Sequence, residues 1–210
     1  MGRLYLVRHG ETEWNAEGRL QGQTDIGLSD KGQRQARAVA RRLEGVSFHA
    51  AYSSDLSRTT ETARIILAQH QEVTLTATSQ LRERHYGVFE GLTAAERQTR
   101  YPDMFAASLS NDLEFAPTDG ETMSQVGARM IAFVAELRER HLEETVLIAG
   151  HGGALRATLP ALLDLPLEAL WRLAMDNCSL SIVDTYPESD GVGAVLRLFN
   201  DTSHLNGVSQ

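Results

Sequence analysis

Short apolar segments alternate with amphipathic helical segments along this sequence, and this alternation constrains the fold more than any other feature does. The predicted strands are Arg3–Arg8, Ala50–Ser53, Val73–Ala77, Thr145–Gly150, Ser179–Asp184 and Ala194–Phe199. Strands that alternate with helices pair mostly in parallel, and the helices then cover both faces of the sheet. The sequence therefore predicts an α/β fold with a mostly parallel sheet.

Helices are predicted between most of these strands. They run from Ser29 or Asp30 to Gly45, over Asp55–Gln69, near Thr93–Arg100, over Glu121–His141 and over Leu155–Leu163. Pro160 is expected to kink or break the last of them, because proline lacks a backbone donor and clashes with the preceding turn. The stretch from Leu81 to about Gly120 is less regular, with a break at Pro102, and a turn is expected at Pro187–Gly193.

The composition excludes several classes of protein. The chain has 210 residues and a formal net charge of −8, which argues against a general nucleic-acid-binding protein. We expect a cytoplasmic protein without a membrane segment, because no apolar run could cross a bilayer and the N-terminus lacks the apolar core of a signal peptide. The one cysteine, Cys178, cannot form an intrachain disulfide or, by itself, a thiolate metal site. The length fits a single domain over residues 1–210.

Polar side chains cluster where the predicted strands end. Arg8 and His9 end the first strand, and His151 follows the strand that begins at residue 145. Arg58 lies at the start of the helix after the second strand, and Glu83 follows the third strand. Because ligands bind at the carboxyl ends of the strands in such sheets, we expect these side chains to surround one ligand.

These residue types suit phosphoryl transfer. The guanidinium groups of Arg8 and Arg58 match phosphate oxygens, and a neutral imidazole at His9 can attack phosphorus. His151 can donate a hydrogen bond to the phosphoryl oxygens. Glu83 can protonate the departing alkoxide and later accept a proton from water. Since arginine and imidazole neutralise the phosphate charge, no metal ion is expected to be needed.

Several motifs then resemble those of a known family. Leu6–Asn15 reads LVRHGETEWN and is similar to the signature of the histidine phosphatase superfamily, in its phosphoglycerate mutase-like branch. The resemblance continues in order through Gly18–Gly22, Leu28–Gly32, Tyr52–Thr59, Glu83–Gly87 and Ala149–Gly153, so it spans essentially the whole chain. It implies a three-layer α/β/α sandwich and one histidine phosphatase domain, with a partly irregular lid over about residues 88–120.

The resemblance also implies roles for individual residues. His9 would be the phosphorylated nucleophile and Glu83 the proton donor and acceptor. The phosphate pocket would consist of Arg8, Arg58, His151 and Asn15. The residues expected near the phosphate or the rest of the substrate are Gln21, Gly22, Thr24, Tyr86 and Gly152, with Arg84 and Arg19 as candidates for binding a carboxylate. His204 lies in a closing motif similar to that of related phosphatases, which raises a role near the mouth of the site.

Two reactions remain open at this point. Mutases that depend on 2,3-bisphosphoglycerate carry an extra basic segment after the Tyr-Gly loop, whereas residues 101–128 here contain acidic side chains and no lysine or arginine. We expect this stretch to repel a bisphosphorylated anion. The sequence therefore favours a phosphomonoesterase that acts on α-ribazole phosphate, phosphoserine or a broad range of esters. Phosphoglycerate mutase, which would require 2,3-bisphosphoglycerate as its cofactor, is the alternative.

The expected partner is accordingly a small phosphorylated metabolite, with no nucleic acid and no membrane. A catalytically inactive phosphate sensor is a third reading, and the complete set of reactive residues argues against it. The family includes monomers, dimers and tetramers, so a homodimer stays open.

Overall fold

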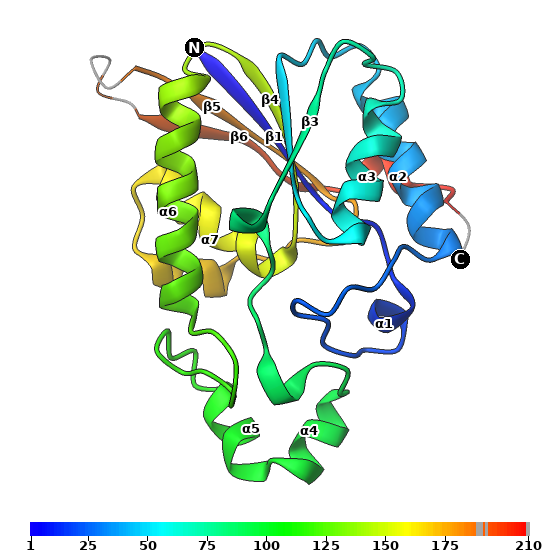
Figure 1. Cartoon of the computed structure of the whole chain (residues 1–210). Coiled ribbons are helices and arrows are strands. Elements are labelled where there is room, and N and C mark those ends of the chain that lie inside the picture. Colours follow the sequence, from blue (N-terminus) through cyan, green and yellow to red (C-terminus); the bar gives the residue numbers. More distant parts are fainter. Residues whose placement is uncertain (188–190, 192, 209–210) are drawn as a thin grey trace.

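A six-stranded sheet forms the centre of the molecule in the computed structural model, which describes residues 1–187, 191 and 193–208. The strands are β1 (Gly2–Arg8), β2 (Ala50–Ser54), β3 (Leu75–Thr78), β4 (Thr145–Gly150), β5 (Leu180–Thr185) and β6 (Ala194–Asp201). They lie in the order β3-β2-β4-β1-β5-β6 (Figure 1). The pairs β3–β2, β2–β4 and β4–β1 are parallel, while β5 is antiparallel to both of its neighbours. The predicted mostly parallel sheet is confirmed.

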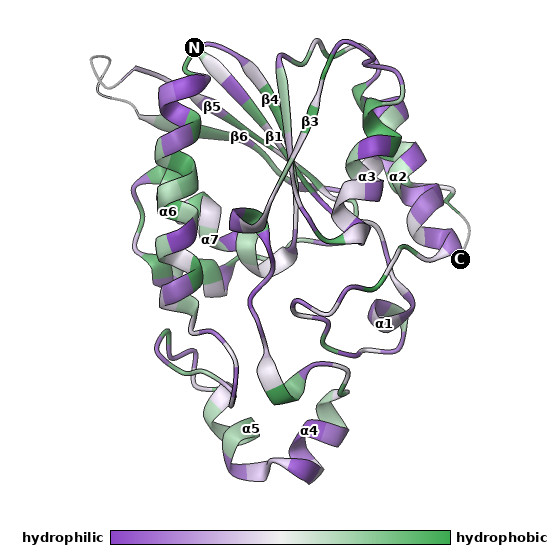
Figure 2. Ribbon diagram, in the orientation of Figure 1, coloured by the Kyte–Doolittle hydropathy of each residue, from purple (hydrophilic) through white to green (hydrophobic). Residues whose placement is uncertain are grey.

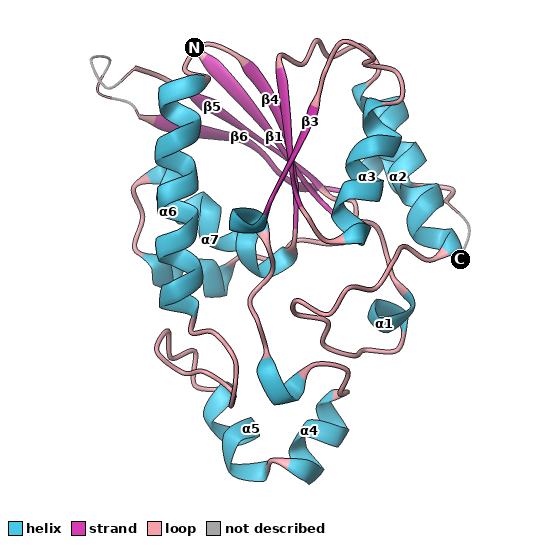
Figure 3. Ribbon diagram, in the orientation of Figure 1, coloured by secondary structure: helices cyan, strands magenta, loops and turns pink. Residues whose placement is uncertain are grey.

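Helices cover both faces of this sheet. The helices are α1 (Glu13–Ala16), α2 (Asp30–Leu43), α3 (Ser57–Leu67), α4 (Ala94–Arg100), α5 (Pro102–Ser108), α6 (Met123–Arg140) and α7 (Gly152–Leu163). Short 3₁₀ turns are η1 (Ser79–Leu81), η2 (Gly87–Phe89), η3 (Leu167–Arg172) and η5 (Ser203–Leu205). Helices α6 and α7 lie on one side of the sheet and α2 and α3 on the other, while α4 and α5 project beyond one end of it (Figures 1 and 3). The predicted three-layer α/β/α sandwich is therefore confirmed.

The core consists of two apolar clusters, one on each face of the sheet. Leu6 and Ile148 point to the cluster shared with α6 and α7, whereas Val7 and Leu147 point to the cluster shared with α2 and α3. These four side chains are fully buried. Successive strand residues face opposite sides, so a strand that is apolar throughout must be covered on both faces. Figure 2 shows green segments within the strands and a mixture of green and purple residues along the helices that cover them.

Several element boundaries differ from the sequence prediction. Helix α7 begins at Gly152 rather than Leu155 and continues through Pro160 to Leu163, so the predicted break does not occur. Leu159 and Leu162, on either side of Pro160, are at most 1% exposed, and their burial holds this turn in place. Pro102 begins α5 rather than only ending a segment, because proline at the first helical position loses no hydrogen bond. The predicted turn at Pro187–Gly193 lies largely outside the described residues.

None of the described helices is both long enough and apolar enough to span a bilayer.

Candidate active site

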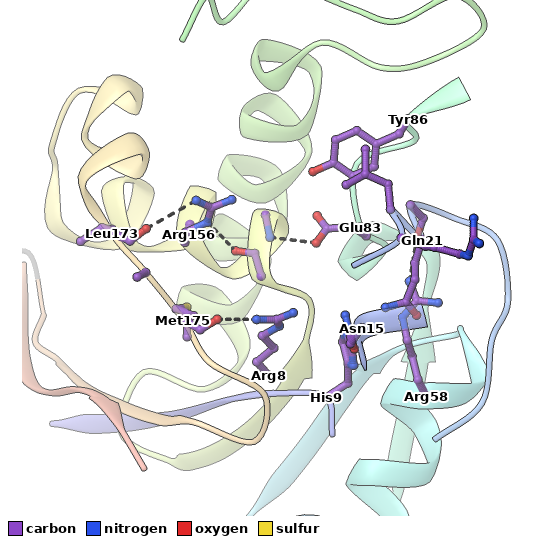
Figure 4. Close-up of a pocket in the computed structure, with 16 residues that line it drawn as sticks. Arg8, His9, Asn15, Gln21, Arg58, Glu83, Tyr86, Arg156, Leu173 and Met175 are labelled. Carbon is purple, nitrogen blue, oxygen red and sulfur yellow. Dashed lines mark hydrogen bonds between the residues drawn. The ribbon is translucent and has the colours of Figure 1, made fainter. Parts of the chain in front are cut away.

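A cavity of about 350 Å³ opens at the carboxyl ends of the parallel strands. Its lining residues are Arg8, His9, Asn15, Arg19, Leu20, Gln21, Gly22, Arg58, Glu83, Tyr86, Gly152, Gly153, Arg156, Leu173, Ala174 and Met175. Figure 4 shows the labelled side chains converging from the end of β1, from α3 and α7 and from the loops around them. Among the described residues, four arginines and one carboxylate line the cavity, so it favours anions.

His9 lies at the end of β1 and is 3% exposed. Its Nδ1 is 2.7 Å from the carbonyl oxygen of Gly10. Because a carbonyl only accepts hydrogen bonds, Nδ1 carries the proton and Nε2 keeps a free lone pair. Burial, together with the charges of Arg8 and Arg58, holds the pKa of His9 well below its ordinary value. The ring is therefore a neutral imidazole in the pH range where phosphate esters are ionised.

His151 is fully buried beside His9, and the two ring centroids are 5.2 Å apart. Arg58 donates from Nε to Nδ1 of His151 over 3.3 Å. Arginine can only donate, so Nδ1 is the acceptor and the proton of the neutral ring lies on Nε2. Burial and then the Arg58 charge keep the pKa of His151 well below its ordinary value. Its Nε2 has no hydrogen-bond partner among the described residues.

Arg8 and Arg58 are held by backbone carbonyls rather than by carboxylates. Arg8 donates from Nη1 to the Met175 oxygen at 2.6 Å, and its buried Nε has no partner among the described residues. Arg58 donates to the carbonyls of Gly22 and Thr24 at 2.7 Å and 2.9 Å. Burial lowers the pKa of Arg58 to about 10, so the group stays charged at neutral pH. The two guanidinium groups therefore remain available to balance a bound anion.

Glu83 closes the opposite side of the cavity. Its carboxylate accepts from the backbone N–H groups of Gly153, Ala154 and Arg84 at 2.9 Å, 3.1 Å and 2.9 Å. Two of these donors are in the first turn of α7, whose amino end favours negative charge. A Cβ atom at Gly153 would overlap the Glu83 carboxylate, so only glycine admits this contact. The backbone of α7 thus determines where the carboxylate lies.

Most of the predicted site residues line the cavity, but His151, Thr24 and Arg84 do not. Asn15, Gln21, Gly22, Tyr86 and Gly152 are in the lining, and His151 lies directly behind it. Thr24 and Arg84 lie outside the lining of the cavity.

Thr24 and Arg84 instead hold the walls of the cavity together. Thr24 Oγ1 donates to Glu90, while its carbonyl accepts from Arg58. Arg84 donates to the carbonyl oxygens of Phe115 and Glu121 at 2.6 Å and 2.8 Å. Its guanidinium also lies over the ring of Tyr86, 5.3 Å from the ring centroid. Arg84 is 6% exposed and ties the lid to the loop that carries Glu83.

The structure adds lining residues that the sequence analysis missed. Arg156 lies one helical turn after Gly152 in α7, and Leu173, Ala174 and Met175 follow η3. The spacing of Arg156 from Gly152 was the only available signal. His204 is not in the lining of the cavity. Its Nε2 is 2.9 Å from the carbonyl oxygen of Cys178, behind the cavity wall.

The lid contributes no residue to the cavity lining. None of the described residues from 88 to 128 is in the lining, so the lid carboxylates form no part of the cavity wall. One of these carboxylates, Glu121, is paired with Arg129 at 3.2 Å. The charge that a ligand meets is set by the arginines of the core instead.

Comparison with known proteins identifies the family. A protein of Yersinia pestis named "Probable phosphoglycerate mutase GpmB" is 41% identical over 98% of this chain and 96% of its own length. The structure of Bacillus stearothermophilus YhfR superposes with a TM-score of 0.87 at 35% identity, covering 98% of this chain and 100% of that one. The α-ribazole phosphatase of Shigella flexneri superposes with a TM-score of 0.87 at 29% identity, covering 95% of this chain and 96% of that one. The family model described as histidine phosphatase superfamily (branch 1) matches residues 4–202, and this chain belongs to that family.

Proposed function

We propose that this protein hydrolyses a small phosphomonoester through a phosphohistidine intermediate on His9. The observation that carries the proposal is the proton arrangement around that ring. His9 presents a free lone pair on Nε2, while the buried donors Arg8 Nε and His151 Nε2 have no partner among the described residues. Buried donors without partners are costly, and a phosphoryl group would satisfy both of them.

The reaction then takes two steps. In the first, His9 Nε2 forms a bond to phosphorus while the bond from phosphorus to the ester oxygen breaks, and Glu83 gives that oxygen its proton. In the second, water attacks phosphorus, Glu83 takes a proton from the water, and the bond between nitrogen and phosphorus breaks. Glu83 must therefore hold a proton at the start of the first step. Arg8, Arg58 and His151 would stabilise the charge on the equatorial oxygens in both steps.

The substrate classes open to this site are those named for its relatives. One structural relative is an α-ribazole phosphatase and another a phosphoserine phosphatase. Phosphoglycerate mutase is the second candidate activity, favoured by the name of the Yersinia pestis relative. A coupled mutase assay with and without 2,3-bisphosphoglycerate separates the two candidates, since only the mutase reaction would depend on the bisphosphate.

Replacement of His9 tests the mechanism. In the presence of excess chelator, the wild type is expected to hydrolyse p-nitrophenyl phosphate and to yield acid-labile protein phosphate after rapid quenching. His9→Ala is expected to lose about 10³-fold or more in kcat, because the nucleophile is gone, and to trap no phosphate. His49→Ala serves as the control, because His49 is exposed and precedes β2 at the opposite end of the sheet. Turnover by His9→Ala within tenfold of the wild type would contradict the proposal.

A further inference from the structure

Glu90 is a carboxylate outside the cavity lining that the proposed reaction does not use. It follows η2, and its side chain is 11% exposed. Its Oε1 accepts from the backbone N–H groups of Gln23 and Tyr86, each at 3.0 Å, and lies 3.7 Å from His85 Nε2. Its Oε2 accepts from the backbone N–H of Thr24 at 2.9 Å and from the hydroxyl of the same residue. One side chain therefore joins the loop between α1 and α2 to the loop around η2, two segments far apart in the chain (Figure 1).

Two carbonyl oxygens on the first of these loops orient Arg58. Its Nη2 donates to the Gly22 carbonyl at 2.7 Å and its Nη1 to the Thr24 carbonyl at 2.9 Å. Its Nε donates to His151, so each Nη keeps one hydrogen for a phosphate oxygen. Arg58 is 1% exposed and has no route to solvent acceptors. The direction of its guanidinium therefore depends on where the two carbonyl oxygens lie.

The loop approaches Glu90 closely. Gly22 has a φ of +56°, and a Cβ atom there would overlap the Glu90 carboxylate, so glycine is required for both the backbone conformation and the contact. Burial lowers the pKa of Arg58 to about 10, and the charges of Glu83, Asp25 and Glu90 oppose this shift. Glu90 thus supports the charge of Arg58 as well as the loop that orients it.

The two ends of this loop are anchored independently of Glu90. Leu20 exchanges backbone hydrogen bonds with residues 91–92, at 2.8 Å and 3.2 Å. At the other end, Asp25 accepts from the backbone N–H and the hydroxyl of Ser57 at 2.8 Å and 2.7 Å. Loss of the Glu90 carboxylate is therefore expected to release the middle of the loop while its ends stay in place.

We infer that Glu90 is a positioning residue for phosphate binding, which acts through Arg58 by holding the loop that carries the Gly22 and Thr24 carbonyls. This inference rests on the proposed phosphatase activity and adds to it a residue that does not touch the substrate. Without the carboxylate, the Gln23 N–H would lack its acceptor, and the loop would shift to satisfy it. The Arg58 guanidinium would move with the carbonyls and lose part of its charged hydrogen bonding to the phosphate.

Binding of inorganic phosphate tests the inference, because it reports on the anion site without catalysis. Glu90→Leu removes both acceptor oxygens at similar size and is expected to raise the Kd for phosphate about tenfold in a calorimetric titration. Glu90→Gln keeps one acceptor oxygen, so its Kd should lie between those of the wild type and Glu90→Leu. A loss of folded protein alone would lower the stoichiometry of the titration and leave Kd unchanged.

A second background tests whether Glu90 acts through Arg58. Arg58→Lys keeps a charge and hence a measurable affinity, but an ammonium does not take its direction from two carbonyls. In this background Glu90→Leu is expected to change the Kd for phosphate less than twofold, because the group through which it acts is gone. Glu72→Leu is the matched control, because Glu72 is exposed and precedes β3 at the opposite end of the sheet, and it should bind phosphate as the wild type does.

The contrary outcomes are distinct. An unchanged Kd in Glu90→Leu, or an equal loss of affinity in the Arg58→Lys background, would overturn the inference while p-nitrophenyl phosphate hydrolysis by the wild type upholds the phosphatase activity. If Glu90→Leu does not fold, Glu90→Gln carries the same test. A wild type that binds phosphate but hydrolyses no ester overturns the proposed function alone, and one that binds no phosphate overturns both.

Discussion

At the scale of single residues, the two cavity histidines differ only in the neighbour that each one meets at Nδ1. His9 meets a carbonyl oxygen and His151 meets a guanidinium, and these partners assign opposite tautomers to two rings of the same chemistry. One ring therefore presents a lone pair and the other a donor. Both rings are neutral for the same reason, since burial beside cationic arginines disfavours a further positive charge.

Gly153 makes the sharpest prediction at this scale. In Gly153→Ala the new Cβ atom would displace the Glu83 carboxylate from its place at the start of α7. We expect hydrolysis of alkyl phosphates to slow by about 10²-fold, and that of p-nitrophenyl phosphate much less, because a poor leaving group needs the proton more. Steady-state kinetics on both esters measure the difference. Gly45→Ala is the control, because its Cβ would meet no atom within 4 Å. Equal slowing of both esters would show that Glu83 is not the acid.

At the scale of elements, the segment between η3 and β5 forms one wall of the cavity. Hydrogen bonds to the C-terminal strand β6 hold this segment in place. Its Asn177 donates to the His9 carbonyl at 3.0 Å and to Asn15 Oδ1 at 3.3 Å. Asp176 and Asn200 bond to each other twice, through the Asp176 backbone N–H at 2.7 Å and through the Asn200 side-chain amide at 2.9 Å. Asn200, at the end of β6, thus fixes a wall that itself holds the catalytic segment.

Loss of the contact between Asp176 and Asn200 should change the geometry of the cavity. We expect Asn200→Ala to lower kcat/KM for p-nitrophenyl phosphate by about tenfold, mostly through KM, since the wall segment supplies the Met175 carbonyl that holds Arg8. Asn206→Ala is the control, because Asn206 is exposed and has the same side chain. Thermal unfolding of both variants separates loss of positioning from loss of fold. Equal kcat/KM values in the two variants would contradict the positioning role.

At the scale of the whole molecule, Asp184 links three neighbouring strands. It accepts from Arg3 of β1 at 2.6 Å and from Arg197 of β6 at 2.8 Å, while it is itself in β5 and 1% exposed. The hydrogen bond from Arg3, and then that from Arg197, keep the pKa of Asp184 below its ordinary value, against the opposing effect of burial. A carboxyl with a lowered pKa in the folded state adds stability above its ordinary pKa and loses it as the pH falls further.

Acid unfolding tests this link. Asp184→Asn is expected to lower the free energy of unfolding at neutral pH by about 1–3 kcal/mol, because two guanidinium groups lose their charged acceptor. The difference from the wild type should shrink as the pH falls below the ordinary Asp value of 3.8, where the wild-type carboxyl also becomes protonated. Urea unfolding at neutral and acidic pH measures it. A difference that stays constant with pH would assign the effect to packing rather than charge.

Local sequence patterns were sufficient to predict the larger part of the fold. The strands β1 and β4 were predictable because each contains a run of consecutive apolar residues, and both faces of the sheet must be covered to bury such a run. The end of α7 was harder to predict. The helix continues through Pro160 because the residues around that proline are buried. Its start was harder as well, because the donors of its first turn are satisfied by Glu83, about seventy residues earlier in the chain. Neither effect can be predicted from the local sequence.

The sequence by itself determined which segments become strands and helices and which reactive residues stand at the strand ends, because periodicity and chain order act locally. Tertiary structure alone decided which nitrogen of each histidine holds its proton and that Arg84 donates to the carbonyl oxygens of Phe115 and Glu121. It also decided that Arg156 lines the cavity and donates to the carbonyl oxygens of Gly152 and Leu173. These properties depend on partners from distant segments, and only folding brings a carbonyl, a guanidinium or a carboxylate within hydrogen-bond distance of its partner.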